Sequence, residues 1–180
     1  IKIFNLTFFI IFLLITKANS LIEIDITRGN LDPLPIAVSP LFQDDNSNKN
    51  SISELNIKNI GSEISSVVEN NLKTSGLFNP LSKDAFLQKP DIAHLKPRFE
   101  DWALIKAQAL ITGKVTHKII NEKDYINVEF KLWDVLGAKM VDGFSLTTTP
   151  RSWRRVGHKI SDKVYERLTG ESGYFDTRII

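Results

Sequence analysis

The side chains best suited to acid–base or metal chemistry in this 180-residue chain are three histidines, His94, His117 and His158. Metal-binding histidines usually follow a short repeat such as H-E-x-x-H, and no such spacing joins these three. Cysteine is absent, which removes thiol catalysis, cysteine metal sites and disulfides. We therefore expect no metal, no cofactor and no catalytic residue. An exported hydrolase using Asp101 with His94 or His158 is an alternative, which their meeting in one pocket would favour.

Two further catalytic motifs, the phosphate-binding loop of nucleotide-binding proteins and the serine elbow of esterases, are not matched by this sequence. Residues 112–114 (T-G-K) resemble part of a phosphate-binding loop, but Gln108 stands where that loop needs its first glycine. Gly113 is better interpreted as a β-bulge or a point of close backbone approach. No G-x-S-x-G serine elbow is present.

A cluster of basic residues on a predicted helix over 151–167 offers a different chemistry. Its members are Arg151, Arg154, Arg155, Lys159 and Lys163. Trp153 beside them could stack on a base or a sugar, so an anion- or nucleic-acid-binding helix is an alternative function, tested by steep salt dependence. The competing interpretation is a solvated helix face, since positive charge near a helix C-terminus is favoured in any case.

The first twenty residues have the pattern of a targeting segment. Phe8 to Ile15 is an unbroken apolar run, and Ala18-Asn19-Ser20 supplies the small residues that a signal peptidase reads. The run is too short to cross a bilayer as a helix. We expect residues 1–20 to be a signal peptide cleaved after about Ser20, and the protein to reside in the periplasm.

Removing that segment makes the chain electrically neutral. Lys2 and Lys17 leave with it and no acidic residue does, so 21 basic residues face 21 acidic ones. Proteins that bind nucleic acid usually show clustered positive charge. The absence of net charge therefore argues against a nucleic-acid partner. The length that remains after removal of residues 1–20 suits one domain.

The segment that follows, residues 21–31, is the candidate partner-binding site. It consists of Leu21, Ile22, Glu23, Ile24, Asp25, Ile26, Thr27, Arg28, Gly29, Asn30 and Leu31. Apolar and polar residues alternate from Leu21 to Thr27, which is the period of a half-buried strand. A strand at a new N-terminus could dock on its own domain, add to the sheet of a partner, or switch between the two.

Helical and strand patterns fill the rest of the chain. Amphipathic helices are predicted from Asn56 to Thr74 and from Thr149 to Leu168, with Gly76 and Gly170 closing them. Shorter elements are a strand at Ile36–Ser39, a strand at Leu77–Phe78, a connector at Pro90–Pro97 and a helix from Phe99 to Lys106. Strands at Ala109–Ile119, Tyr125–Asp134 and Met140–Thr148 should form an antiparallel meander.

These elements predict the α/β fold class. We expect a single domain in which a mixed β-sheet of four to six strands packs against two main amphipathic helices, preceded by the signal peptide. The expected divisions are a partner-binding segment over 21–33, an α/β domain over 34–172, and the first strand of a further unit over 173–180.

Four long motifs carry a family resemblance. They are I-x-I-T-R-G-N-L-D-P-L-P-I-A-V-S-P-L-F (24–42), N-L-K-T-S-G-L-F-N-P-L (71–81), I-T-G-K-V (111–115) and R-R-V-G-H-K-I-S-D-K-V-Y-E-R-L-T-G-E-S-G-Y-F-D-T-R-I (154–179). Together they resemble the N-terminal domain of the TolB family, periplasmic proteins of the Tol-Pal cell-envelope system. The resemblance covers residues 21–180.

This resemblance implies a non-enzymatic envelope component. In the family the mature N-terminal segment, here Leu21 to Leu31, engages the C-terminal domain of TolA. The system supports outer-membrane integrity and cell division, and bacteriocins use it for import; any membrane contact would be indirect, through partners. A six-bladed propeller that contacts Pal is expected after this domain. Because the chain ends at Ile180, we interpret it as a fragment or a truncated product and do not expect Pal binding from it; a non-functional fragment is an alternative.

Overall fold

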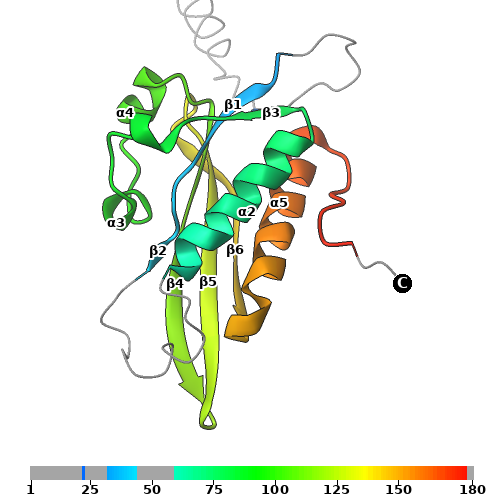
Figure 1. Cartoon of the computed structure of the whole chain (residues 1–180). Helices are drawn as coiled ribbons and strands as arrows, with labels where there is room; N and C mark the ends of the chain where they lie inside the picture. The colour runs from blue at the N-terminus through cyan, green and yellow to red at the C-terminus, as the bar shows by residue number, and fades with distance from the viewer. Residues whose placement is uncertain (1–21, 23–31, 44–58, 178–180) are drawn as a thin grey trace, which may run out of the picture.

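A computed structural model describes residue 22 and residues 32–43 and 59–177 (Figure 1). The predicted signal peptide lies outside the described residues, as does all of the candidate segment except Ile22. Within the described part, no helix combines the length and the apolar character that a membrane crossing requires.

The elements follow one another in a mixed order of strands and helices. They are β1 (Leu34–Val38), β2 (Phe42–Gln43), α2 (Ile60–Thr74), β3 (Phe78–Pro80), η2 (Lys83–Ala85), α3 (Pro90–Ala93), α4 (Phe99–Leu104), β4 (Ala109–Ile120), β5 (Lys123–Asp134), β6 (Lys139–Thr148), η3 (Pro150–Ser152) and α5 (Trp153–Thr169). The predicted α/β class is confirmed, and the residues expected to form a connector after Pro90 instead contain the one-turn helix α3. That turn forms because Pro90 fixes a helical φ at its first position and Ala93 N–H donates to the Lys89 carbonyl, 3.0 Å away.

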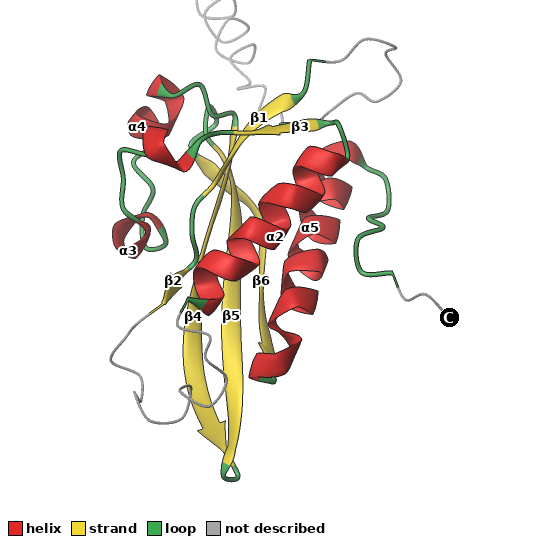
Figure 2. Ribbon diagram, viewed as in Figure 1, coloured by secondary structure: helices red, strands yellow, loops and turns green. Residues whose placement is uncertain are grey.

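The sheet has six strands in the order β3-β1-β4-β5-β6, with β2 pairing beside β4 (Figure 2). β1 pairs in parallel with both β3 and β4, whereas β4, β5 and β6 form the predicted antiparallel meander. A two-residue turn joins β4 to β5, and its residues Asn121 and Glu122 both have positive φ, 48° and 61°. Positive φ at both central positions suits the right-handed twist of a hairpin.

The helices α2 and α5 lie side by side over one face of the sheet (Figure 1). On β5, alternate residues point into this main core, which buries Ile126, Val128, Phe130 and Leu132. The helices approach closely at Gly157, where an added Cβ would lie 2.7 Å from Val67 Cγ1. The alternation and the two helical stripes therefore form one continuous apolar layer, as the sequence predicts.

A smaller cluster covers the opposite face at one end of the sheet. Trp102 from α4 packs there with Leu110 of β4, Val135 and three alanines. The buried amide of Gln88 joins the local backbone to this cluster: its Oε1 accepts from Trp102 Nε1 at 3.0 Å and from Arg98 N–H at 2.9 Å. Its Nε2 donates to the Lys96 carbonyl at 3.0 Å.

Two glycines fill the roles that the sequence assigns them. Gly170 ends α5 with φ 75°, a left-handed conformation that glycine adopts without strain. Gly113 lies in β4 where an added Cβ would be 2.1 Å from the Glu129 carbonyl oxygen. The register of β4 with β5 is continuous there, so Gly113 marks a close backbone approach and not a bulge.

Of the residues expected to begin a further unit, 173–177 are described; Phe175 and Asp176 form a bend and the other three have no regular secondary structure. They are held against α5 because Asp162 accepts two of their backbone N–H groups, from Phe175 at 2.7 Å and from Asp176 at 3.1 Å. Gly173 permits this contact, since a Cβ there would lie 2.4 Å from the Asp162 Cα.

Candidate functional site

The candidate partner-binding segment meets the described structure at Ile22. Its side chain is half-buried and packs against the main core, and the other ten residues of the segment lie outside the described part. The alternation predicted for Leu21 to Thr27 therefore remains a prediction, with one apolar member in contact with the domain.

The segment leads into a firmly held strand. β1 is flanked on both sides by parallel partners, and Leu34 N–H donates to the Leu77 carbonyl at 2.9 Å. Leu34, Ile36 and Val38 enter the main core. A displacement of the residues before Leu34 would therefore act on a strand that is hydrogen-bonded on both sides and buried in the main core.

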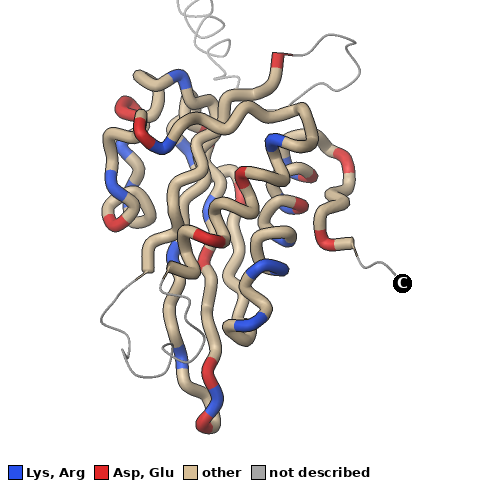
Figure 3. Tube along the Cα trace, in the orientation of Figure 1, with Lys and Arg blue, Asp and Glu red and all other residues tan. Residues whose placement is uncertain are grey.

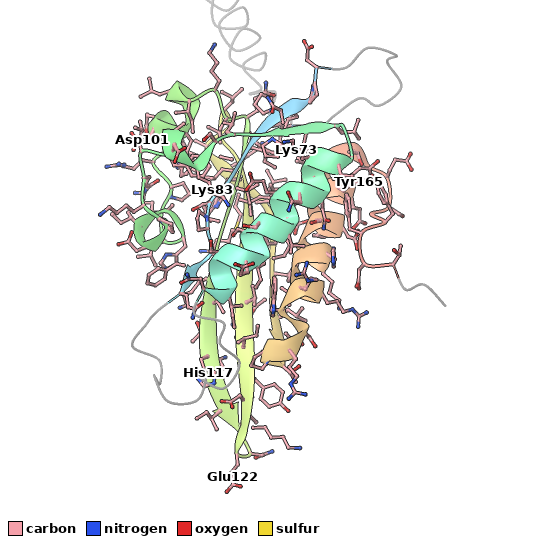
Figure 4. All side chains as sticks on the ribbon, viewed as in Figure 1. Lys73, Lys83, Asp101, His117, Glu122 and Tyr165 are labelled. Carbon is pink, nitrogen blue, oxygen red and sulfur yellow. The ribbon has the colours of Figure 1, made fainter. Side chains whose placement is uncertain are left out.

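The residues proposed for hydrolysis are not brought together. Asp101 lies on α4 (Figure 4) and His158 on α5, and no hydrogen bond or ion pair joins Asp101, His94 and His158 among the described residues. Asp101 forms an ion pair with Arg98, and His158 Nδ1 lies 2.9 Å from Asn71 Nδ2. Within the described ranges no group of three or more potential metal ligands occurs.

The other two histidines also make structural contacts. The His94 ring stacks on Phe42 with centroids 4.7 Å apart, and its Nδ1 lies 3.1 Å from the Pro90 carbonyl. His117 Nε2 lies 2.7 Å from Asp124 Oδ1 across the hairpin. These contacts match the interpretation of the histidines as hydrogen-bonded structural residues.

The basic helix is partly neutralised by its surroundings. Arg155 Nε donates to both carboxylate oxygens of Asp176, at 3.0 and 3.1 Å. This hydrogen bond and the charge of Asp176 raise the pKa of Arg155. Trp153 is half-buried against the main core and carries the guanidinium of Arg154 over its ring, 4.9 Å from the centroid. Its ring is therefore already engaged within the protein.

An aromatic group completes the contact between residues 173–177 and α5. The Tyr165 ring meets the Tyr174 and Phe175 rings edge to face, with centroids 5.4 and 5.9 Å apart. Burial raises the pKa of the Tyr165 hydroxyl, with smaller contributions from Tyr174 and Glu171. The chain after α5 thus follows a defined path across the helix.

The two outer edges of the sheet, β3 and β6, differ in length and in proline content. β3 forms one edge with three residues, and its Pro80 has no N–H to donate. β6 forms the other with ten residues, and no described residue pairs with its outer side. From Gly143 to Thr149 this edge has neither a charge nor a proline.

A groove separates β6 from α5. A cavity of about 90 Å3 lies there, lined by Leu146, Thr148, Ser152, Arg155, Val156 and Lys159. Arg155, Lys159 and Lys163 follow one another at four-residue steps and so lie on one side of α5; we call these three the cationic stripe. Lys163 reaches across the groove to Asp142 of β6, with Nζ 3.5 Å from Oδ2.

Sequence reasoning missed the groove, the Gln88 amide and the acceptor role of Asp162. Only the groove had a local signal, the uncharged residues from Gly143 to Thr149 followed by a basic helix. The amide and carboxylate contacts join residues that no sequence period relates, so nothing in the spacing could have identified them.

The two sequence comparisons with known proteins show one family. The sequence model of the TolB amino-terminal domain matches residues 22–141. The Tol-Pal system protein TolB of Pelagibacter ubique (strain HTCC1062) is 65% identical over 173 residues, which is 96% of this chain. The chain spans 38% of that relative's length.

A solved structure gives the same result for the fold. The crystal structure of TolB from Acinetobacter baumannii superposes with a TM-score of 0.59 over 81% of this chain and 30% of that one. At 23% sequence identity this likeness establishes the architecture alone.

Proposed function

This chain belongs to the TolB amino-terminal domain family, and on that premise we propose that it is a non-catalytic interaction module of a Tol-Pal cell-envelope system. Family membership is the observation that carries the proposal, because the match begins at residue 22 and so includes most of the candidate segment. The separate, structurally engaged histidines support a role without catalysis.

The binding partner proposed for residues 21–31 is the C-terminal domain of TolA. The segment would add to the TolA sheet as an extra strand, using backbone hydrogen bonds for affinity and the alternating Ile22, Ile24 and Ile26 for specificity. Ordering a free segment costs roughly 1–2 kcal/mol per residue, so the added strand must form most of its hydrogen bonds to bind.

The half-buried contact of Ile22 supports a competition between two positions of the segment. Burial of part of an isoleucine contributes about 1 kcal/mol, which is small enough for a partner to overcome. The segment can then rest against its own domain when TolA is absent and leave when TolA binds.

The setting proposed for this module is the periplasm, after removal of residues 1–20. There it would support outer-membrane integrity and cell division, and would be available to bacteriocins during import. Contact with Pal is left out of the proposal because the resemblance assigns that contact to a propeller.

The decisive experiment is a titration of the TolA C-terminal domain against two forms of the chain, residues 21–180 and residues 32–180. We expect the longer form to bind and the shorter form to lose at least a hundredfold in affinity, read from backbone amide shifts and calorimetry. Equal binding by the two forms would contradict the proposal.

Point variants separate strand addition from a merely hydrophobic contact. Ile24→Pro removes an N–H that a β ladder needs, whereas Ile24→Val keeps the N–H and most of the apolar surface. We expect the proline variant to bind at least tenfold more weakly than the valine variant. Circular dichroism of both variants controls for the fold.

A further inference from the structure

The outer edge of β6 has the usual protection of an edge strand only over its first residues, where Lys139 and Asp142 carry charges and the register with β5 shifts opposite Leu132 and Trp133. Natural sheets shield exposed edges with prolines, charges, bulges or very short strands, because an open ladder pairs readily with other chains. β3 has two of these protections, its short length and Pro80. The seven residues from Gly143 to Thr149 have no charge and no proline, and threonine, phenylalanine and leucine among them favour extended backbone.

The side chains of β6 also leave the main core incompletely covered. Leu146 lies opposite the fully buried Val128, and Phe144 lies opposite the fully buried Phe130, yet both β6 residues are only half-buried. A further strand beside β6 would cover part of their exposed surface.

The helix that overhangs this edge is cationic. Figure 3 shows basic residues along the half of α5 that begins near Trp153. Lys159 lines the groove beside β6 and has no carboxylate partner among the described residues, while Arg155 and Lys163 hold one acidic partner or two. Lys159 is therefore the residue of the stripe that offers positive charge, without an acidic partner among the described residues, to a chain that enters the groove.

We propose that the outer edge of β6 and the cationic stripe of α5 form a strand-addition site for an extended acidic segment of a partner protein. The backbone of that segment pairs with β6. Its alternate side chains point toward α5, where glutamate or aspartate meets Arg155 and Lys159 in the groove. The other side chains continue the polar outer face beside Ser145 and Thr147, both of which donate hydrogen bonds to Asn127 Oδ1.

A second copy of this chain fits the edge less well. Two β6 edges paired across a two-fold axis would place both α5 helices on the same side of the joint sheet, with their cationic stripes adjacent. Like charges at an interface oppose association, whereas an acidic segment neutralises the stripe. This site differs from the proposed TolA contact, in which the chain supplies the added strand and does not receive one.

The test uses the full chain and a synthetic peptide of alternating glutamate and threonine, as long as β6. Two control peptides have the same length. One replaces glutamate by lysine, and the other carries N-methyl groups at alternate residues, which removes half of its N–H donors. We expect the acidic peptide to bind with shifts in the amide signals of β6, and each control to bind at least tenfold more weakly.

Charge variants of the protein test the role of the stripe. Lys159→Glu should weaken the acidic peptide about tenfold and remove most of its salt dependence. Lys73→Glu makes the same charge change on an exposed lysine of α2 and should leave binding within twofold.

Four results would overturn the proposal. The first two are equal binding of the N-methylated and unmodified peptides, and amide shifts centred on α3 and α4 instead of β6. The third is strong exchange protection of the outward β6 amides in the free chain, which would mean that another part of this chain already occupies the edge. The fourth is concentration-dependent dimerisation through β6.

Discussion

The two faces of the sheet are stabilised by different kinds of interaction. The face under α2 and α5 buries a continuous apolar layer of twenty described residues, whereas the face under α3 and α4 buries six, half of them alanine. Buried polar contacts occur on both faces: Gln88 makes three hydrogen bonds in the small cluster, and under α2 the Ser65 hydroxyl accepts from Leu41 N–H and lies 3.1 Å from the Ser39 carbonyl oxygen. Because its apolar layer is much smaller, the small cluster should depend more on these contacts to stay in place.

The largest expected effect lies in the apolar layer. Phe130→Ala removes a side chain that is 1% exposed at the centre of the main core. We expect a loss of about 3–5 kcal/mol in the free energy of unfolding, measured by urea denaturation, with all elements unfolding together. Phe144→Ala is the matched control: its ring is half-buried, 5.2 Å from the Phe130 ring, and should cost about half as much. If only α3 and α4 unfolded in Phe130→Ala, the main core would not stabilise the whole domain, and the comparison of the two faces would be wrong.

The next effect concerns the glutamine of the small cluster. Gln88→Leu replaces the amide by a slightly shorter apolar side chain and leaves two N–H donors and one carbonyl without their partner. We expect a loss of about 2–3 kcal/mol, confined to α3 and α4, because buried unsatisfied groups cost about 1–3 kcal/mol each and part of this region can reach water.

Amide hydrogen exchange provides the measurement for this variant. Exchange should accelerate across residues 90–104 and stay unchanged in α2 and α5. Gln108→Leu is the control, since Gln108 is exposed, and should leave exchange in both regions as it is. A uniform acceleration after Gln88→Leu would show that the two faces are not separately stabilised.

The smallest effect is expected for the polar contact within the large face. Asn71 Nδ2 lies 2.9 Å from both His158 Nδ1 and Ser161 Oγ, and it joins α2 to α5. Asn71→Ala should cost about 0.5–1.5 kcal/mol by thermal or urea unfolding, because the helices are already held by apolar packing. The exposed neighbour Asn70→Ala should be close to neutral. If Asn71→Ala lowered the free energy of unfolding more than Gln88→Leu does, the large face would depend more on polar contacts than the small cluster, contrary to our expectation.

Local periodicity accounts for the parts of the fold that the sequence predicts well. The alternation of Ile126, Val128, Phe130 and Leu132 defines β5 and its buried face, and three- and four-residue steps define α2 and α5. Gly170 closes α5 as expected because few other residues adopt φ 75° without strain. Each of these signals depends on residues fewer than about twenty positions apart.

Distant contacts decide the structure where the local pattern is weak. Asp162 accepts the N–H groups of Phe175 and Asp176 and holds residues 173–177 against α5, while the division expected over 173–180 remains a prediction. The segment after Pro90 looks like a connector, but Gln88 and Trp102 draw it into a compact cluster. The candidate segment 21–31 remains a sequence prediction apart from Ile22.

The sequence by itself determined the elements, their buried faces and the family, because these depend on hydrophobic period, turn residues and long motifs. Tertiary structure alone decided the parallel placement of β1 between β3 and β4, and with it which strand forms the open edge. The physical reason is that strand order follows from pairing between segments far apart in the chain, and each strand's own sequence is compatible with several neighbours.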